Sequence, residues 1–292
     1  MNTLYHYTSL NGVLGILHSR AIWASHVSYL NDASEFLHGV SFAREIAGNI
    51  FMADDYLAAF GWAVRHALEA VSAVDLYTAS FSEKADLLSQ WRGYCPAGAG
   101  LCLGFDSDLL RDYCLERGYR LEKCIYTHDE QIRQVRTLVS ECLEEFPSRD
   151  LSRQDYEKLT SKERVDTDLA YQDRTTRGSD STQANAATER LCANIEKLTP
   201  LFKHEGFHEE AEWRIVANEP REKIKFRASS SYLVPYIELP VVSHGSGSVL
   251  REVIIGPNPN HDRCAKSIEM LLAAGGLSEV EVKSSSIPFN SW

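Results

Sequence analysis

Short apolar stretches along the chain are interspersed with segments in which apolar residues recur every three or four positions. The first pattern predicts strands and the second predicts amphipathic helices. Strands are predicted at residues 4–8, 21–24, 76–82, 101–105, 121–126, 213–217, 224–226, 234–239, 253–255 and 280–282. Helices are predicted after the N-cap residue Ser9, from Asp32 through Glu35, at 57–71, from Asp106, and at 132–146, 187–198 and 264–273. Strands cluster towards both ends and do not alternate regularly with helices. The pattern therefore favours an α+β fold with a mixed or antiparallel central sheet over a doubly wound sheet.

Residues 148–184 differ from the rest of the chain. Polar and charged residues dominate there, and the few apolar residues, such as Leu159 and Val165, are widely spaced. This composition predicts an exposed, partly helical excursion with a mobile stretch around residues 177–179. We therefore expect residues 1–292 to form a single domain, with a largely helical and partly mobile insertion at about residues 127–200.

Composition and charge narrow the classes of partner. The chain has 292 residues, 44% of them hydrophobic, and a net charge of -11, which disfavours a general electrostatic grip on a nucleic-acid backbone. A local basic pocket for one dinucleotide remains compatible with this charge. The seven cysteines are an odd number without a C-x-x-C pair, which favours reduced thiols in a core. No signal peptide and no apolar run of membrane-spanning length occurs, so we expect a cytoplasmic protein without a membrane partner.

Three short motifs carry the candidate chemistry, and each lies in or beside a predicted strand. They are His6-Tyr7-Thr8, Ser80-Phe81-Ser82 and Glu210-Ala211-Glu212-Trp213-Arg214. Side chains repeat every two residues on a strand, so Ser80 and Ser82 should share one face. Glu210, Glu212 and Arg214 should do the same if their segment is extended.

The motifs resemble those of known families. The segments LYHYTS at 4–9, LND-x-x-E at 30–35 and E-x-E-W-R at 210–214 resemble a bacterial family of unknown function over nearly the full length. The order His, Ser-x-Ser, Glu-x-Glu resembles the ADP-ribosyltransferase superfamily. That resemblance implies a split-sheet catalytic domain that binds NAD as substrate and cleaves its nicotinamide bond. The ADP-ribose would pass to water or to an acceptor, protein or nucleic acid, and toxin or defence roles are typical of such families.

The resemblance also implies roles for individual residues. His6, supported by Thr8, would bind a ribose hydroxyl, because a neutral imidazole offers one donor and one acceptor. Ser80 and Ser82 would shape the cleft and orient the late glutamate. Glu212 would stabilise the positive charge that develops on the ribose.

The resemblance gives the remaining candidates supporting roles. Glu210 would prepare the acceptor, and Arg214 would pair with a carboxylate or a diphosphate. Tyr7 and Trp23 are candidates for stacking on nicotinamide or adenine. Separately, Gln90-Trp91-Arg92-Gly93-Tyr94 is a candidate segment, in which Trp91 and Arg92 could line a cleft and Arg92 bind a phosphate. The alternative is that Trp91 covers the edge of the core.

Two other function classes stay open. His204-Glu205-Gly206-Phe207-His208 matches H-E-x-x-H, which on a helix would place His204 and His208 together as zinc ligands of a hydrolase. Pro200 and Gly206 instead favour a loop that leads into Glu210 and Glu212. The third class is a non-catalytic nucleotide-sensing or interaction module that retains the cleft without turnover.

Overall fold

The computed structural model describes residues 3–30, 33–69, 71, 75–96, 98–244 and 247–288. The chain divides into two compact units. Unit 1 comprises Met1–Asn31, Asp75–Cys124 and Lys203–Trp292, and unit 2 comprises Asp32–Val74 and Ile125–Phe202. All three candidate motifs belong to unit 1. The expected insertion lies within unit 2, which also takes in residues 32–74. The prediction of one catalytic domain stays a prediction.

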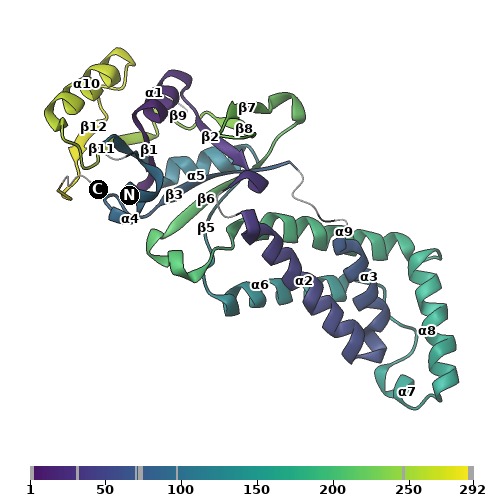
Figure 1. The fold of residues 1–292 in the computed structure, drawn as a ribbon. Coiled ribbons are helices and arrows are strands. Elements are labelled where there is room, and N and C mark those ends of the chain that lie inside the picture. Colours follow the sequence, from purple (N-terminus) through teal and green to yellow (C-terminus); the bar gives the residue numbers. More distant parts are fainter. Residues whose placement is uncertain are drawn as a thin grey trace. The chain divides into compact units, whose positions relative to one another are not determined.

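Unit 1 is built on a mixed sheet (Figure 1). Its described strands are β1 (Thr3–Ser9), β2 (Ile22–His26), β3 (Leu76–Ser82), β4 (Gly100–Asp106), β5 (Arg120–Lys123), β6 (Glu212–Asn218), β7 (Lys225–Ala228), β8 (Leu233–Leu239), β9 (Ser243–His244), β10 (Gly247–Ser248), β11 (Leu250–Ile255) and β12 (Glu281–Ser284). The main order is β12-β11-β4-β1-β3-β2-β8-β7, while β6 pairs with β3 and β5, and β9 pairs with β10 apart from this sheet. The pair β11–β12 is parallel and the other pairs of the main sheet are antiparallel, which confirms the predicted mixed sheet. Helices α1 (Leu10–Ser19), α4 (Leu88–Tyr94), α5 (Ser107–Glu116) and α10 (His261–Ala274) complete the unit, with the 3-10 turns η1 (Val27–Tyr29), η4 (Glu205–Glu210) and η5 (Arg221–Lys223).

Strand β3 has two different neighbours along one edge. Strand β6 pairs with its whole length on the other edge. On the first edge, β1 meets β3 at Ser82, whereas β2 meets it at Tyr77 and Thr78. A strand has only two edges, so β1 and β2 must separate along the middle of β3. Ser80 lies at this separation.

Alternation of side chains gives the sheet two apolar faces. One face carries the main core, in which Leu101, Leu103 and Phe105 of β4 are fully buried. The other face carries a smaller cluster, in which Cys102 of the same strand packs with Tyr7 and Trp91. The predicted N-cap Ser9 is confirmed, because its hydroxyl accepts the Gly12 N–H.

Two further predictions from the sequence have different outcomes. Five of the seven cysteines are buried and all seven are free thiols, as expected of core residues. The predicted cap Asp32 and its neighbour Asn31 lie outside the described residues, as does the side chain of Glu35.

Unit 2 is helical (Figure 1). Its described helices are α2 (Ala33–Ala53), α3 (Ala58–Glu69), α6 (His128–Glu145), α7 (Arg153–Glu157), α8 (Ser161–Thr176) and α9 (Ser181–Leu198), with 3-10 turns η2 (Asp55–Leu57) and η3 (Thr199–Leu201). Helix α2 packs on α3 and α6, and α9 packs on α6, α8 and α3. The predicted apolar stripes face this core, where Val64, Val135 and Ile195 are fully buried. No helix in the described part of the chain is long and apolar enough to cross a membrane.

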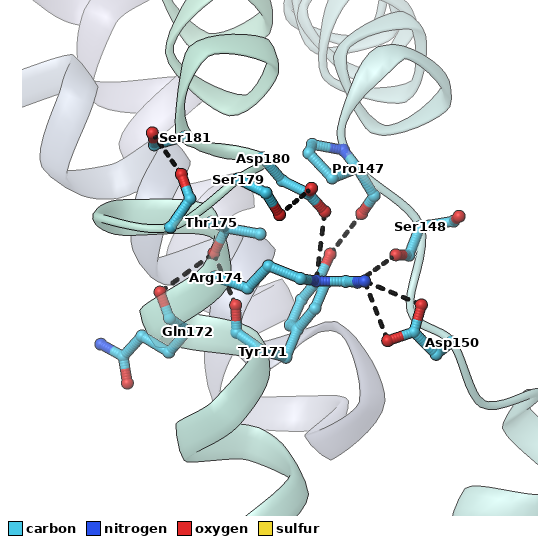
Figure 2. A network of polar contacts seen from close by, with 11 residues as sticks. Pro147, Ser148, Asp150, Tyr171, Gln172, Arg174, Thr175, Ser179, Asp180 and Ser181 are labelled. Carbon is cyan, nitrogen blue, oxygen red and sulfur yellow. Dashed lines mark hydrogen bonds and ion pairs between the residues drawn. The ribbon is translucent and has the colours of Figure 1, made fainter.

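The polar segment 148–184 is more regular than its composition suggested. Arg174, near the end of α8, binds both carboxylate oxygens of Asp150, the Ser148 carbonyl and the Asp180 carboxylate (Figure 2). Its neighbour Tyr171 donates to the Pro147 carbonyl. These bonds tie the turn between α8 and α9 to the segment after α6. The expected mobility of residues 177–179 stays a prediction.

Candidate functional site

The pairing of β3 with β6 brings two of the three motifs together. Ser80 lies opposite Arg214, and Ser82 lies opposite Glu212. Residues directly opposite each other in an antiparallel pair project from the same face. The predicted alternation of the Ser-x-Ser motif therefore places both serines on the face that carries Glu212 and Arg214.

Glu210 reaches this face by a different route from the one the sequence suggested. It ends the 3-10 turn η4 and is not extended, and Ala211 then adopts a left-handed conformation with φ of 43°. The Glu-x-Glu motif is thus a turn followed by the first residue of β6, because the chain must change direction before pairing with β3. The buried Ser82 hydroxyl fixes this turn by donating to the Glu210 carbonyl at 2.6 Å, and it accepts the Lys84 N–H at 2.9 Å.

Glu210, Glu212 and Arg214 form a buried ionic cluster with Lys203. The Lys203 ammonium lies 2.9 Å from a Glu210 oxygen and 2.5 Å from a Glu212 oxygen. Arg214 contacts both oxygens of Glu212, at 2.8 and 3.3 Å. All four residues are at most 8% exposed.

The cluster sets the charge of Glu212. Burial alone would raise the pKa of this carboxyl, but Arg214 and Lys203 outweigh it and hold the pKa at about 2. Burial likewise disfavours the charged form of Lys203, but Glu212 and Glu210 raise its pKa above the ordinary value. Glu212 is therefore a carboxylate and Lys203 an ammonium at neutral pH.

His6 of β1 contacts β3 near the place where β1 and β2 separate. Its Nδ1 lies 2.9 Å from the Ser80 carbonyl oxygen, and its ring packs against Phe81. Burial lowers the pKa of His6, partly offset by this bond, so the ring is neutral near pH 7. A carbonyl only accepts, so Nδ1 carries the proton and Nε2 is left as an acceptor.

A small cavity of about 60 Å³ joins these residues. Its lining residues are Tyr5, His6, Tyr7, Ser80, Phe81, Gln90, Tyr94, Glu210 and Glu212. Within the described residues, the Ser80 hydroxyl and the Gln90 side-chain amide have no hydrogen-bond partner, although Gln90 is only 7% exposed. The cavity wall therefore offers donors and acceptors that the described part of the protein does not use.

The other predicted site residues lie elsewhere or already have partners. Tyr7 lines the cavity, but its hydroxyl donates to the Lys84 carbonyl and accepts the Leu87 N–H. Thr8, Trp23 and Arg92 are not among the lining residues. The Thr8 side chain lies against Gly12, Trp23 stacks on Tyr236 at 4.5 Å, and Arg92 is exposed on α4.

The H-E-x-x-H segment does not form the helix on which the zinc hypothesis depended. Residues 205–210 form a 3-10 turn with His204 as its N-cap, so three residues and not 3.6 make a turn. Both Nδ1 atoms are engaged locally, His204 with the Gly206 N–H and His208 with the Glu205 carbonyl. Across the described ranges, no group of three or more His, Cys, Asp or Glu residues could hold a metal ion. The loop that Pro200 and Gly206 favoured is therefore the better description.

Sequence reasoning missed Lys203, and it marked the segment that contains Gln90 and Tyr94 without giving either residue a role. Gln90 and Tyr94 lie on α4, a helix too short to show an apolar period. Lys203 is one lysine after an apolar pair, and nothing in its neighbours marks it as buried. The contacts of Lys203 with Glu210 and Glu212 can be seen only once β6 is paired with β3.

One comparison with known proteins gave a match. A family model described as a protein of unknown function (DUF2971) matches residues 90–215. Comparisons with curated proteins and with solved structures gave no match. The chain is thus similar to that family over a region that contains the ionic cluster but neither His6 nor Ser80, and the description assigns no reaction.

Proposed function

We propose that the protein is a NAD-consuming enzyme similar to ADP-ribosyltransferases, which cleaves the nicotinamide bond and transfers ADP-ribose to an acceptor or to water. The observation that supports the proposal is the convergence of His6, Ser80, Glu210 and Glu212 on one cavity. These residues come from three motifs far apart in the sequence. They meet beside the place where β1 and β2 separate along β3.

The donors and acceptors of the cavity suit a ribose. Neutral His6 presents Nε2 as an acceptor for one hydroxyl, and Ser80 can donate or accept. Nicotinamide leaves with the electron pair of the broken bond, so positive charge develops on the ribose. The ionised Glu212 would stabilise that charge, and its pKa of about 2 keeps it ionised throughout the physiological range. Glu210 would accept the proton that the attacking hydroxyl or water loses.

The size of the cavity limits what enters it. Its 60 Å³ compares with about 30 Å³ for a water molecule in the liquid and about 300 Å³ or more for a typical ligand pocket. One polar group of a dinucleotide fits, and the rest of NAD must lie outside the enclosed space. Tyr94 is the most exposed of the lining tyrosines, at 44%, so its ring is the best placed of them to contact that remainder.

A nicotinamide-release assay tests the proposal. Purified wild type, Glu212→Gln and Glu219→Gln would be incubated with NAD, each with and without a chelator. Glu219 is the matched control, because it is also ion-paired, to Lys223, and hydrogen-bonded to Tyr119, yet it does not line the cavity. We expect release by wild type and Glu219→Gln, a loss of about 100-fold or more in Glu212→Gln, and no effect of the chelator. Equal release by Glu212→Gln and wild type would refute the assigned chemistry.

One observation favours a second candidate, a NAD-binding module without turnover. Both oxygens of Glu212 are already held by Arg214 and Lys203. Calorimetry on the same samples separates the two functions. Binding of NAD without nicotinamide release, even with acceptors supplied, would favour the module, and absence of both binding and release would reject both.

A further inference from the structure

We propose that Lys203 is the positioning residue that holds Glu210 and Glu212 together as a reactive pair. The inference rests on the proposed function for its catalytic consequence, but the arrangement itself is visible in unit 1. Lys203 is 1% exposed and contacts both carboxylates through one ammonium group. It also lies 5.1 Å from the centre of the Phe207 ring, on the turn that carries Glu210.

A bridge is needed because Glu210 and Glu212 do not share a strand. Glu210 ends a 3-10 turn, Ala211 reverses the chain, and Glu212 begins β6. Two carboxylates brought together away from water repel each other, and one of them would then take up a proton more readily. Lys203 and Arg214 supply two positive charges to balance the two negative ones.

Lys203 acts through the glutamates and not on the substrate. It is not among the lining residues of the cavity, and its ammonium is too firmly protonated to serve as a base or nucleophile. Arg214 holds Glu212 in a two-bond contact, whereas Lys203 reaches across to Glu210 as well. Loss of Lys203 would leave two carboxylates with the single charge of Arg214.

Other titratable groups near the pair lie on β1, α4, β5 and the turn η4. From β1, Tyr5, His6 and Tyr7 line the cavity, and Tyr94 does so from α4. Burial raises the pKa of Tyr5 to about 12, also raises that of Tyr7, and lowers that of His6. Glu122 lies opposite Arg214 on β5, but it is about half exposed and paired with Arg120. His204 and His208 on the turn that carries Glu210 are present in every variant. A loss of rate at pH 4–6 that appears only in Lys203→Met would therefore report on the glutamate pair.

The experiment compares Lys203→Met with Lys283→Met. Lys283 is the matched control, because it also contacts two glutamates, Glu252 and Glu281, but it is half-exposed and lies outside the cavity lining. Two quantities are measured from pH 4 to 8, the rate of nicotinamide release and the urea midpoint of unfolding. In Lys203→Met we expect the rate to fall at least tenfold between pH 7 and 5, a loss that wild type and Lys283→Met do not show. The urea midpoint of Lys203→Met should instead rise over the same interval, because a carboxyl whose pKa is raised in the folded state stabilises that state when it takes up a proton.

A second variant keeps the test decisive if Lys203→Met folds poorly. Lys203→Met combined with Glu210→Gln restores the charge balance, so it should fold and lose the acid dependence of the urea midpoint. The same acid dependence in Lys203→Met and Lys283→Met would overturn the inference, as would a double variant no more stable than Lys203→Met. If wild type releases no nicotinamide, the proposed function fails, while the urea midpoints still decide the role of Lys203.

Discussion

Replacement of Ser82 by alanine should weaken the turn that carries Glu210. The Ser82 hydroxyl is buried, donates to the Glu210 carbonyl at 2.6 Å and accepts the Lys84 N–H at 2.9 Å. Each such bond contributes about 1 kcal/mol net, so its loss should lower the free energy of unfolding by about 2 kcal/mol. For a cooperative unit of about 150–250 residues, that corresponds to a fall of roughly 4–8 °C in Tm.

Ser80→Ala is the matched control on the same strand. Ser80 shares the face of Ser82, but in the described part of the chain its hydroxyl has no partner and lines the cavity. Its loss should therefore change the free energy of unfolding by about 0.5 kcal/mol or less. If the proposed function holds, it should still slow nicotinamide release about fivefold, because one hydrogen bond to the ribose is lost.

Two assays measure the difference directly. Urea unfolding of wild type and both variants gives the free energies. Native-state hydrogen exchange of the peptide that contains Lys84 reports whether its N–H loses protection, which should happen in Ser82→Ala alone. Equal destabilisation by the two substitutions, or unchanged exchange at Lys84 in Ser82→Ala, would refute this account of the turn.

Two further predictions concern the same site. Ala211→Gly should leave the protein as stable or stabilise it by up to about 1 kcal/mol, because a left-handed alanine costs about 1–2 kcal/mol and glycine loses about 0.5–1 kcal/mol of that advantage in the unfolded chain. Ala217→Gly, at a buried residue near the end of β6, is the control that urea unfolding should show to be destabilised, and similar losses in both would contradict the argument. His6→Asn should flatten the pH dependence of stability. The folded pKa of His6 is lowered, so its stabilising contribution is complete above the unfolded value of about 6.5 and is lost as pH falls from there towards the folded pKa. Urea midpoints at pH 5 and 7.5 should therefore lie closer together in His6→Asn than in wild type, and an unchanged difference would count against a neutral His6.

Local pattern was sufficient to predict most of the elements that position the site. The alternation in 76–82 gave β3 and the shared face of Ser80 and Ser82, and the apolar run after Glu212 gave most of β6. The pairing between these strands could not be predicted, because register depends on the packing of residues about 130 positions apart. The mixed α+β class followed from the order of elements, whereas the grouping of residues 32–74 with 125–202 depends on contacts between helices that are distant in sequence.

The ionic cluster shows why the rest was hidden. A shared face for Glu210 and Glu212 required an extended segment, but the side chain of Ser82, remote in sequence, stabilises a 3-10 turn and a left-handed residue instead. A lysine is normally exposed. No apolar periodicity around Lys203 indicates that this lysine is buried. Its burial becomes favourable only when two carboxylates arrive from the turn and from β6.

Stability alone is a poor reason for four charged side chains to be buried beside a cavity. Removing charges from water costs several kcal/mol for each ion, and apolar residues of similar volume often replace a buried ion pair without loss of stability. The cluster is neutral as a whole, with Lys203 and Arg214 opposite Glu210 and Glu212, so it can be buried without a net charge. What an apolar replacement could not supply is an ionised carboxylate at the cavity wall at every physiological pH. The arrangement therefore supports the proposal that Glu212 acts on a group in the cavity, since its contribution to folding alone would not explain the buried charges.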